Sequence, residues 1–283
     1  MERGRLYFLG AGNMGEAMLH RIYEAEAKIL ITVISRNCEK NEYLKKRYPR
    51  ARIEERLTIP LTEDDILLIA TKPKDVKNAL FSLPVEKALL VSVAAGISAA
   101  NLRKITANPR IIRLMPNTPV SVGQGVVGFW AAEAVSKKDI EKLSNVLNPL
   151  GMLIFLEEEE GIDLITAVSG SGSAYVFYFM AGLYEAAFRL GFTKEQSHQL
   201  TLKTFAGALA LAQESNEEFT ALKEKVTSKG GTTFAALSIF KEHHVKETIE
   251  KAVTAAKNRA KEMATELELS LIHISEPTRL GMI

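Results

Sequence analysis

Two hydrophobic periods alternate through the first half of the chain. Short apolar runs, typical of buried strands, are separated by longer segments in which apolar residues recur at helical spacing. The predicted strands are residues 6–9, 29–34, 66–70, 88–94, 110–115, 125–129 and 152–156. The predicted helices run from a first glycine-rich turn to residue 27, then over 39–48, 73–81, 98–106 and 137–148. Pro73 suits a first helical position, and Ser136 with Asp139 forms a capping pair. The alternation predicts a parallel, doubly wound α/β sheet.

The pattern changes after residues 157–160, four glutamates that we interpret as a solvated acidic linker. No further strand is predicted. A helix over 173–190 is apolar on nearly every face, a capping box at 193–196 starts an Ala- and Leu-rich helix over 195–213, and a last helix begins at residue 245. We expect the apolar helix to lie in a helical core or a dimer interface and not in a membrane.

The sequence therefore predicts two domains and a tail. Residues 1–160 form the doubly wound domain, and residues 161–268 form an all-α domain. Residues 269–283 lack the helical pattern, and 269–279 resemble the conceptual translation of a sequencing adapter. We expect this tail to be non-native, with a short natural extension as the alternative.

Composition excludes several classes of protein. The chain has 283 residues, 25% of them charged, and a net charge of +2 without a basic patch, which argues against nucleic acid or an anionic membrane surface as a partner. A single cysteine, Cys38, excludes an internal disulfide framework. His198, His243 and His244 lack metal-ligand spacing, so no metal is expected. The start of the chain lacks the features of a secretory signal, which favours the cytoplasm.

A glycine fingerprint follows the first predicted strand. Gly10-Ala11-Gly12-Asn13-Met14-Gly15 stands between that strand and a helix. In a dinucleotide-binding Rossmann domain, the first glycine permits a tight turn, the second lets the pyrophosphate approach the backbone, and the third lets helix and strand pack closely. We predict that these six residues bind a dinucleotide.

The end of the second strand favours NADPH, with NADH as a weaker alternative. An acidic residue there usually binds the ribose 2′-hydroxyl of NAD, but this chain has Ser35-Arg36-Asn37. Arg36 can pair with a 2′-phosphate, and Ser35 and Asn37 supply neutral hydrogen bonds. The alternative is an ordinary surface arginine.

Two further segments are predicted at the carboxyl edge of the sheet, where ligands bind. Ala70-Thr71-Lys72-Pro73 closes one strand, and Lys72 either reaches a cofactor oxygen or is solvated. Asn117, in Met115-Pro116-Asn117-Thr118-Pro119, is either an amide partner of the cofactor or a residue that bonds its own backbone.

The most informative stretch is Ser228-Lys229-Gly230-Gly231-Thr232-Thr233. Two glycines followed by two hydroxyl residues at a helix start can hold a small carboxylate, because free N–H groups and the helix dipole favour an anion there. The alternative is a plain Gly-Gly turn with a threonine N-cap.

Together these motifs resemble the pyrroline-5-carboxylate reductase family. The resemblance rests on the glycine fingerprint, Ala70 to Pro73, Ser92 to Ile97, Arg113 to Pro119, Asp163 to Tyr175 and Val226 to Thr233, in matching order to about Glu266. It implies NADPH-dependent reduction of 1-pyrroline-5-carboxylate to L-proline. It also implies a helical domain that forms a homodimer, active sites completed across the dimer, and dimers that can assemble further.

The resemblance also implies roles for the glycine–threonine stretch. Ser228, Gly230, Gly231, Thr232 and Thr233 would bind the substrate, with backbone amides on its carboxylate, and Thr233 would donate, relay or orient the proton for the ring nitrogen. The family usually has proline where Lys229 and Ser173 stand. Lys229 loosens the loop but adds a cation, and Ser173 can still cap a helix.

Two other functions stay open from sequence. One is a regulatory relative that senses NADPH without turnover, which Lys229 and Ser173 would favour. The other is a sister reductase acting on a larger imine or a keto acid, although the chain shows no clear equivalent of the helix-borne lysine on which related hydroxyacid dehydrogenases rely.

Overall fold

The computed structural model describes residues 5–26, 28–81 and 83–273, with side chains through residue 267. These residues form two compact units. The first holds the described residues up to 171 together with those from 256 onward, and the second holds residues 172–255. The end of the last helix therefore belongs to the sheet-containing unit.

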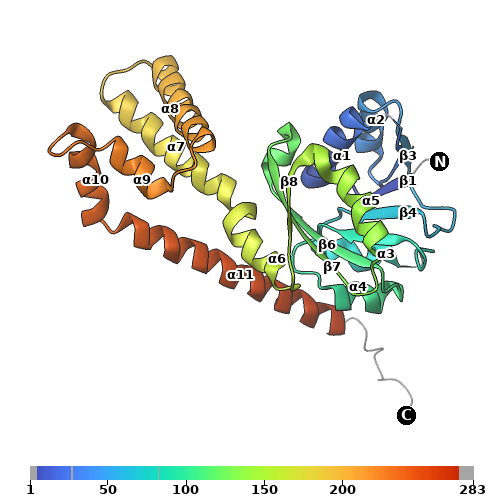
Figure 1. Ribbon diagram of the computed structural model, residues 1–283. Helices are drawn as coiled ribbons and strands as arrows, with labels where there is room; N and C mark the ends of the chain where they lie inside the picture. The colour runs from blue at the N-terminus through green and yellow to red at the C-terminus, as the bar shows by residue number, and fades with distance from the viewer. Residues whose placement is uncertain (1–4, 27, 82, 274–283) are drawn as a thin grey trace, which may run out of the picture. The chain divides into compact units, whose positions relative to one another are not determined.

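The first unit is built on an eight-stranded sheet of order β3-β2-β1-β4-β5-β6-β7-β8 (Figure 1). The strands are β1 Arg5–Leu9, β2 Leu30–Ile34, β3 Arg52–Glu54, β4 Asp65–Ile69, β5 Leu89–Ser92, β6 Ile111–Pro116, β7 Gly125–Ala131 and β8 Gly151–Phe155. The short strand β3 was not predicted, because its sequence Arg-Ile-Glu contains no apolar run.

The parallel sheet predicted from the sequence is confirmed over β1 to β6, but the last two strands run in the opposite direction. Strands β1 to β6 pair in parallel, but β7 runs antiparallel to β6, and β8 is parallel to β7. The connection from β6 to β7 holds only a short 3₁₀ turn, η2 (Thr118–Val122). A parallel return needs a crossover of roughly a dozen residues or more, so this short connection reverses the strand.

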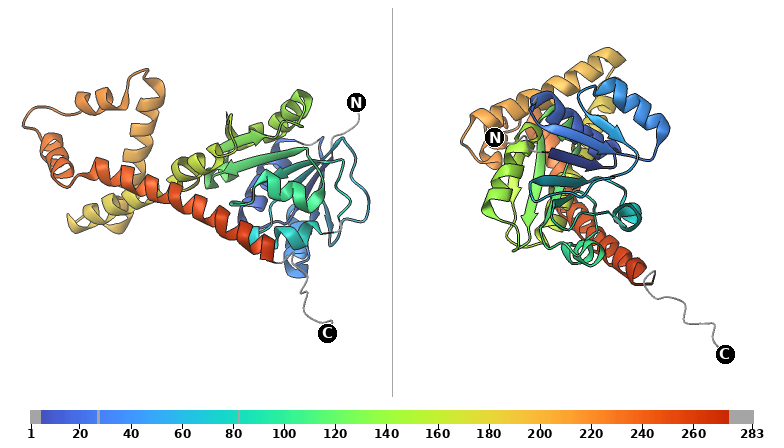
Figure 2. Two further views of the ribbon diagram at one scale, coloured as in Figure 1. Left: turned by 90° about the horizontal axis from the view of Figure 1, so that it is seen from below. Right: turned by 90° about the vertical axis from the view of Figure 1, so that its right-hand side faces the viewer.

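Helices cover both faces of the sheet (Figure 2). They are α1 Asn13–Ala25, α2 Cys38–Arg47, α3 Val76–Leu80, α4 Ala99–Thr106 and α5 Lys137–Leu147. Phe8 and Leu68 pack in one apolar core with α1, α2 and α5, whereas Leu9 and Leu67 pack in another with α3 and α4. Neighbouring strand residues reach opposite cores because their side chains alternate across the sheet.

The rest of the described chain is helical, as predicted. It comprises α6 Gly161–Ile165, a π-helical turn η4 Thr166–Gly170, α7 Gly172–Arg189, α8 Lys194–Glu214, α9 Phe219–Lys225, α10 Thr232–Glu242 and α11 Val245–His273. The predicted capping box at Thr193 and Gln196 is present. Ser173, however, is the second residue of α7 and not its cap.

The start of the predicted tail is helical instead of unpatterned. Helix α11 continues through residues 269–273, and residues 274–283 lie outside the described residues. No glycine or proline stands between Val245 and Pro277, so the chain carries no strong stop signal where the apolar spacing fades.

The apolar helix α7 is largely uncovered within one chain. The helical stretch Gly161–Arg189 is long and apolar enough to cross a membrane by length and composition, and 11% of its most apolar window is buried. Phe177 is 64% exposed and Tyr178 is 78% exposed. The expectation of a core helix is therefore wrong for the single chain, and the interface stays a prediction.

Candidate functional site

The carboxyl ends of the central strands lie level with one another. Leu9 pairs with Ile34 on one side and with Ile69 on the other, and Ile69 pairs with Ser92. The chain builds outward from β1 to β3, then continues from β4 on the opposite side of β1. Such a reversal opens a crevice at this edge, which is where dinucleotides bind in doubly wound sheets.

The glycine fingerprint forms a tight turn at this crevice. Gly10 has φ +91°, and a Cβ there would lie 2.9 Å from Thr71 Cγ2. A Cβ at Gly15 would lie 2.8 Å from the Cβ of Ala70. A Cβ at Gly12 would have no neighbour nearer than the Ala70 carbonyl oxygen at 4.0 Å, and Gly12 is exposed. The turn thus packs tightly against the chain after β4 but stays open at Gly12.

Helix α1 starts without a side-chain cap. Its N-cap is Gly12, which accepts from the N–H of Glu16 at 2.8 Å. Among the described residues, the N–H groups of Asn13, Met14 and Gly15 have no backbone partner in the turn. By contrast, side chains cap α2, α4, α5 and α8: Asn37, Ser98, Ser136 and Thr193. Ala11 is buried beneath the turn. The free donors of α1 and the open Gly12 fit a pyrophosphate.

The segment after β2 is ordered by hydrogen bonds. Asn37 Oδ1 accepts from the N–H of Lys40 at 2.9 Å, so this side chain is engaged as a helix cap. Asn41 Nδ2 donates to the Ser35 carbonyl oxygen at 2.8 Å. Asn41 is buried, and the sequence analysis did not identify its role. The only signal in the sequence was a polar residue on the side of α2 that faces the core. Arg36 is exposed, and its guanidinium has no ion-pair partner among the described residues.

The segment after β4 contributes a buried hydroxyl. Thr71 Oγ1 is buried and has no hydrogen-bond partner among the described residues. Lys72 is exposed, and Pro73 opens the short 3₁₀ turn η1 (Pro73–Asp75), as predicted for a first helical position. An orphaned hydroxyl beside Gly10 is a candidate contact for a bound polar group, since buried polar atoms normally have partners.

Asn117 is buried, and both polar atoms of its side-chain amide are hydrogen bonded within the protein. Its Oδ1 accepts from the N–H of Val126 at 2.8 Å, and its Nδ2 donates to Ser169 Oγ at 3.0 Å. The side chain therefore joins β6, β7 and the π-helical turn η4. It does not bond its own backbone, and these two contacts give it a structural role in addition to any contact with a ligand.

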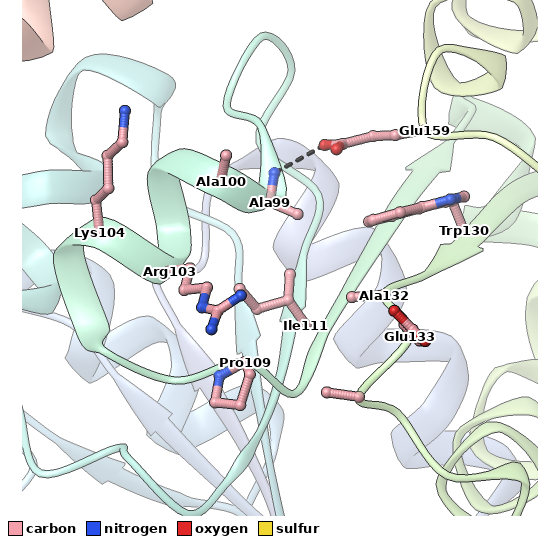
Figure 3. A pocket seen from close by; sticks show the side chains of 11 residues that line it. Ala99, Ala100, Arg103, Lys104, Pro109, Ile111, Trp130, Ala132, Glu133 and Glu159 are labelled. Atoms are coloured by element: carbon pink, nitrogen blue, oxygen red, sulfur yellow. Dashed lines mark hydrogen bonds between the residues drawn. The ribbon is translucent and has the colours of Figure 1, made fainter.

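The acidic segment after β8 is not simply a solvated linker. Glu159 Oε1 accepts from the N–H of Ala99 at 2.7 Å, at the start of α4 (Figure 3). The same oxygen accepts from Arg113 Nη1 at 2.8 Å. Arg113 lies on β6 with its side chain 8% exposed. Nearby, burial raises the pKa of Asp163, while the charges of Arg113 and Lys261 oppose that rise. The other three glutamates are exposed, as predicted, so the prediction is wrong for Glu159 alone. A local run of like charge does not show which glutamate pairs with a distant arginine.

A hollow of about 720 Å³ lies next to this contact, and it is not at the glycine fingerprint. Its lining includes Arg103 of α4, Trp130 of β7 and Glu159 (Figure 3). The hollow opens the Glu159 side chain to solvent, in keeping with its 25% exposure.

Helix α10 starts in the same uncapped way as α1. Its N-cap is Gly231, Thr232 is its first residue, and no side chain caps it, so the alternative of a threonine N-cap is wrong. Gly230 has φ +73°, and the N–H of Gly231 donates to the Ser228 carbonyl oxygen at 3.1 Å. The Gly231 amide is therefore used within the turn. The N–H groups of Thr232, Thr233 and Phe234 lack backbone partners among the described residues and remain for a ligand.

The hydroxyl residues of this turn are accessible. Ser228 and Thr232 are exposed and Thr233 is partly buried. No cluster of metal-ligating side chains occurs in the described part of the chain. The predicted cofactor residues thus lie in the first unit, at the start of α1 and after β2, β4 and β6, and the predicted substrate residues lie at the start of α10 in the second unit.

Protein-family models match both the sheet-containing N-terminal part and the helical C-terminal part of the chain. Residues 159–263 match the family model for pyrroline-5-carboxylate reductase dimerisation, and residues 5–96 match the model for NADP oxidoreductase, coenzyme F420-dependent. The pyrroline-5-carboxylate reductase of Pseudomonas aeruginosa is 33% identical, over 94% of this chain and 99% of that protein.

Solved structures agree as well. A pyrroline-5-carboxylate reductase from Coxiella burnetii matches with a TM-score of 0.80 and 31% identity, covering 92% of this chain and 98% of that one. The Plasmodium falciparum pyrroline carboxylate reductase, solved with NADP bound, matches with a TM-score of 0.77 and 26% identity, covering 92% and 99%. The chain has the glycine fingerprint and the uncapped α10 start, and it is 33% identical to the Pseudomonas aeruginosa reductase over 94% of its length. It therefore belongs to the pyrroline-5-carboxylate reductase family.

Proposed function

We infer that this protein reduces 1-pyrroline-5-carboxylate to L-proline, the last step of proline synthesis, with a nicotinamide dinucleotide as reductant. The observation that carries the proposal is the pair of uncapped, glycine-led helix starts in a member of this family. One stands at a dinucleotide crevice, and the other carries two threonines. The bound cofactor would supply the hydride.

We propose that the cofactor is held by the fingerprint residues Gly10 to Gly15, by Ser35, Arg36 and Asn37, and by the segment from Ala70 to Pro73. The free N–H groups of α1 would bind the pyrophosphate, and Arg36 would favour NADPH over NADH by pairing with the 2′-phosphate. The cap formed by Asn37 would keep Arg36 at the crevice edge. Asn117 would act mainly by holding the end of β6 in place.

The substrate carboxylate would lie at the start of α10. The N–H groups of Thr232 and Thr233 are free to donate to it, while Ser228, Gly230 and Gly231 shape the turn. Thr233 would orient or relay the proton that the ring nitrogen needs, with positioning supplying most of the rate. A threonine hydroxyl is a weak acid, so water or an already protonated imine can be the proton source.

We further propose a cytoplasmic homodimer in which residues 161–268 form the dimerisation and substrate domain and each active site is completed across the dimer. The exposed aromatic residues of α7, among them Phe177 and Tyr178, supply an apolar surface that a second copy would cover. The family model for dimerisation spans the same helices.

The test is oxidation of NADPH with 1-pyrroline-5-carboxylate, compared with NADH and with Thr233→Ala. We expect turnover with NADPH preferred, and a fall of about 10²- to 10⁴-fold in kcat for the variant, the usual contribution of a proton-transfer group. Thr227→Ala is the matched control, because Thr227 Oγ1 donates to the Lys223 carbonyl oxygen in the preceding turn.

Tight NADPH binding without any turnover would overturn the reductase and favour an NADPH sensor. Turnover of a keto acid in preference to the cyclic imine would favour a sister reductase. Neither alternative gains support from the described geometry, in which the fingerprint and both threonines are intact.

A further inference from the structure

Glu159 holds the start of α4 through a contact that spans 60 residues of sequence. Its carboxylate accepts from the N–H of Ala99 at 2.7 Å. The local cap of this helix is already present, since Ser98 Oγ accepts from the N–H of Asn101. A negative charge at a helix N-terminus is favourable, so Glu159 adds a second, distant cap to the same helix.

The same oxygen pairs with a buried arginine. Arg113 donates to Glu159 Oε1 at 2.8 Å and lies on β6, directly opposite Ser92 at the end of β5. A guanidinium that is 8% exposed is costly to bury unless it meets an opposite charge. A single carboxylate oxygen of Glu159 therefore links β6 to the start of α4.

These contacts frame the loop between β5 and α4, residues 93–98. At its start, the N–H of Val93 donates to the Ile69 carbonyl oxygen at the end of β4. In its middle, Gly96 has φ +74°, and a Cβ there would lie 2.8 Å from Leu267 Cδ1 of α11. At its end stands the Glu159 contact with Ala99. The loop is thus fixed at three points beside the crevice.

The position of this loop decides which part of a dinucleotide it can touch. The glycine fingerprint lies on the half of the sheet built from β1 to β3, and the loop follows β5 on the other half. A doubly wound sheet of this kind binds one mononucleotide per half. The half containing β4 to β6 would then take the nicotinamide mononucleotide.

We propose that Glu159 is a positioning residue for the nicotinamide half of the cofactor, acting through the N–H of Ala99 and the guanidinium of Arg113 to fix residues 93–98. The proposal rests on the proposed use of a nicotinamide dinucleotide. Glu159 itself touches neither substrate nor reacting atoms, and its effect is confined to one half of the crevice.

The experiment measures binding of two probes to the full-length protein by calorimetry. NADP⁺ spans both halves of the crevice, and adenosine 2′,5′-bisphosphate represents the adenosine half alone. For Glu159→Ala we expect NADP⁺ to bind roughly tenfold more weakly, since misplacement of a positioning loop by a fraction of an ångström has effects of this order. Binding of adenosine 2′,5′-bisphosphate should not change.

Three further variants complete the design. Glu158→Ala is the matched control, because Glu158 is an exposed neighbour in the same acidic segment with no side-chain bond among the described residues. Glu159→Gln retains an oxygen that can accept both bonds but removes the charge that Arg113 pairs with, and should recover only part of the affinity. Glu159→Asp keeps the charge but shortens the side chain, and should repeat the selective loss even if the alanine variant does not fold.

Equal affinities for NADP⁺ in wild type and in the folded Glu159→Ala and Glu159→Asp variants, with only a lower melting temperature, would overturn the positioning role. Equal loss for both probes would also overturn it, because the effect would then not be local to one half. If the wild-type protein bound no NADP⁺ at all, the proposed function would fail first and the positioning role with it.

Discussion

Helices α1 and α10 begin in similar ways but in different surroundings. Both follow glycines, both lack a side-chain cap, and both leave first-turn N–H groups free. The turn before α1 is packed: Cβ atoms added at Gly10 or Gly15 would lie within 3 Å of the segment after β4. The turn before α10 is open at Gly230, where nothing lies within 4 Å of an added Cβ, and a Cβ added at Gly231 would meet only Ser228 of the same turn.

The difference separates two uses of glycine. At α1 the glycines are needed by the fold, since helix, strand and neighbouring loop meet there without room for a side chain. At α10 Gly230 is needed for its left-handed backbone alone. The first proposed anion site is therefore built within one unit, whereas the second proposed site depends on its own turn and on whatever covers it in the proposed dimer.

The largest expected effect comes from adding a methyl group to each turn. Gly10→Ala should destabilise the protein by about 2–5 kcal/mol, because a left-handed backbone and overpacking act together, and should abolish NADP⁺ binding. Gly230→Ala should cost about 1–2 kcal/mol from backbone strain alone. Urea unfolding and NADP⁺ titration measure both. Equal destabilisation by the two changes would contradict the distinction between the turns.

A smaller effect is expected at the edge of the α1 site. Arg36→Gln should lower the preference for NADPH over NADH by about tenfold, as a charge-assisted contact contributes ~1.5 kcal/mol or more. The ratio of kcat/KM for the two cofactors measures it. Lys28→Gln is the control, since Lys28 is exposed near the opposite end of the same strand. An unchanged ratio in the Arg36 variant would leave Arg36 as an ordinary surface residue.

The smallest effect is expected in the α10 turn. The bond from the Gly231 N–H to the Ser228 carbonyl oxygen, with positive φ at Gly230, matches a type II turn, which favours proline at the position of Lys229. Lys229→Pro should stabilise the protein by about 0.4–1 kcal/mol by restricting the unfolded chain. Thermal unfolding measures the gain. A clear loss of stability would show that the Lys229 backbone does not adopt the proline-compatible conformation.

Much of this arrangement could be predicted from local sequence. The strands around β1, β2 and β4, the caps at Ser136 and Thr193, and the helical second half all follow from short-range pattern and were confirmed. The errors came where distant residues decide. The direction of β7 depends on a connection too short for a crossover, and the exposure of α7 depends on which distant segments pack against it.

The candidate site divides in the same way. The sequence by itself determined the glycine turns, the hydroxyl residues and the absence of an acidic residue after β2, because backbone freedom and side-chain chemistry belong to single residues. Only the tertiary structure decided that Asn117 forms hydrogen bonds with Val126 and Ser169. It also decided that the Gly231 N–H donates within its own turn and that Glu159 pairs with Arg113. Those partners are distant in sequence or set by one dihedral angle, and only the folded backbone brings them within hydrogen-bonding distance.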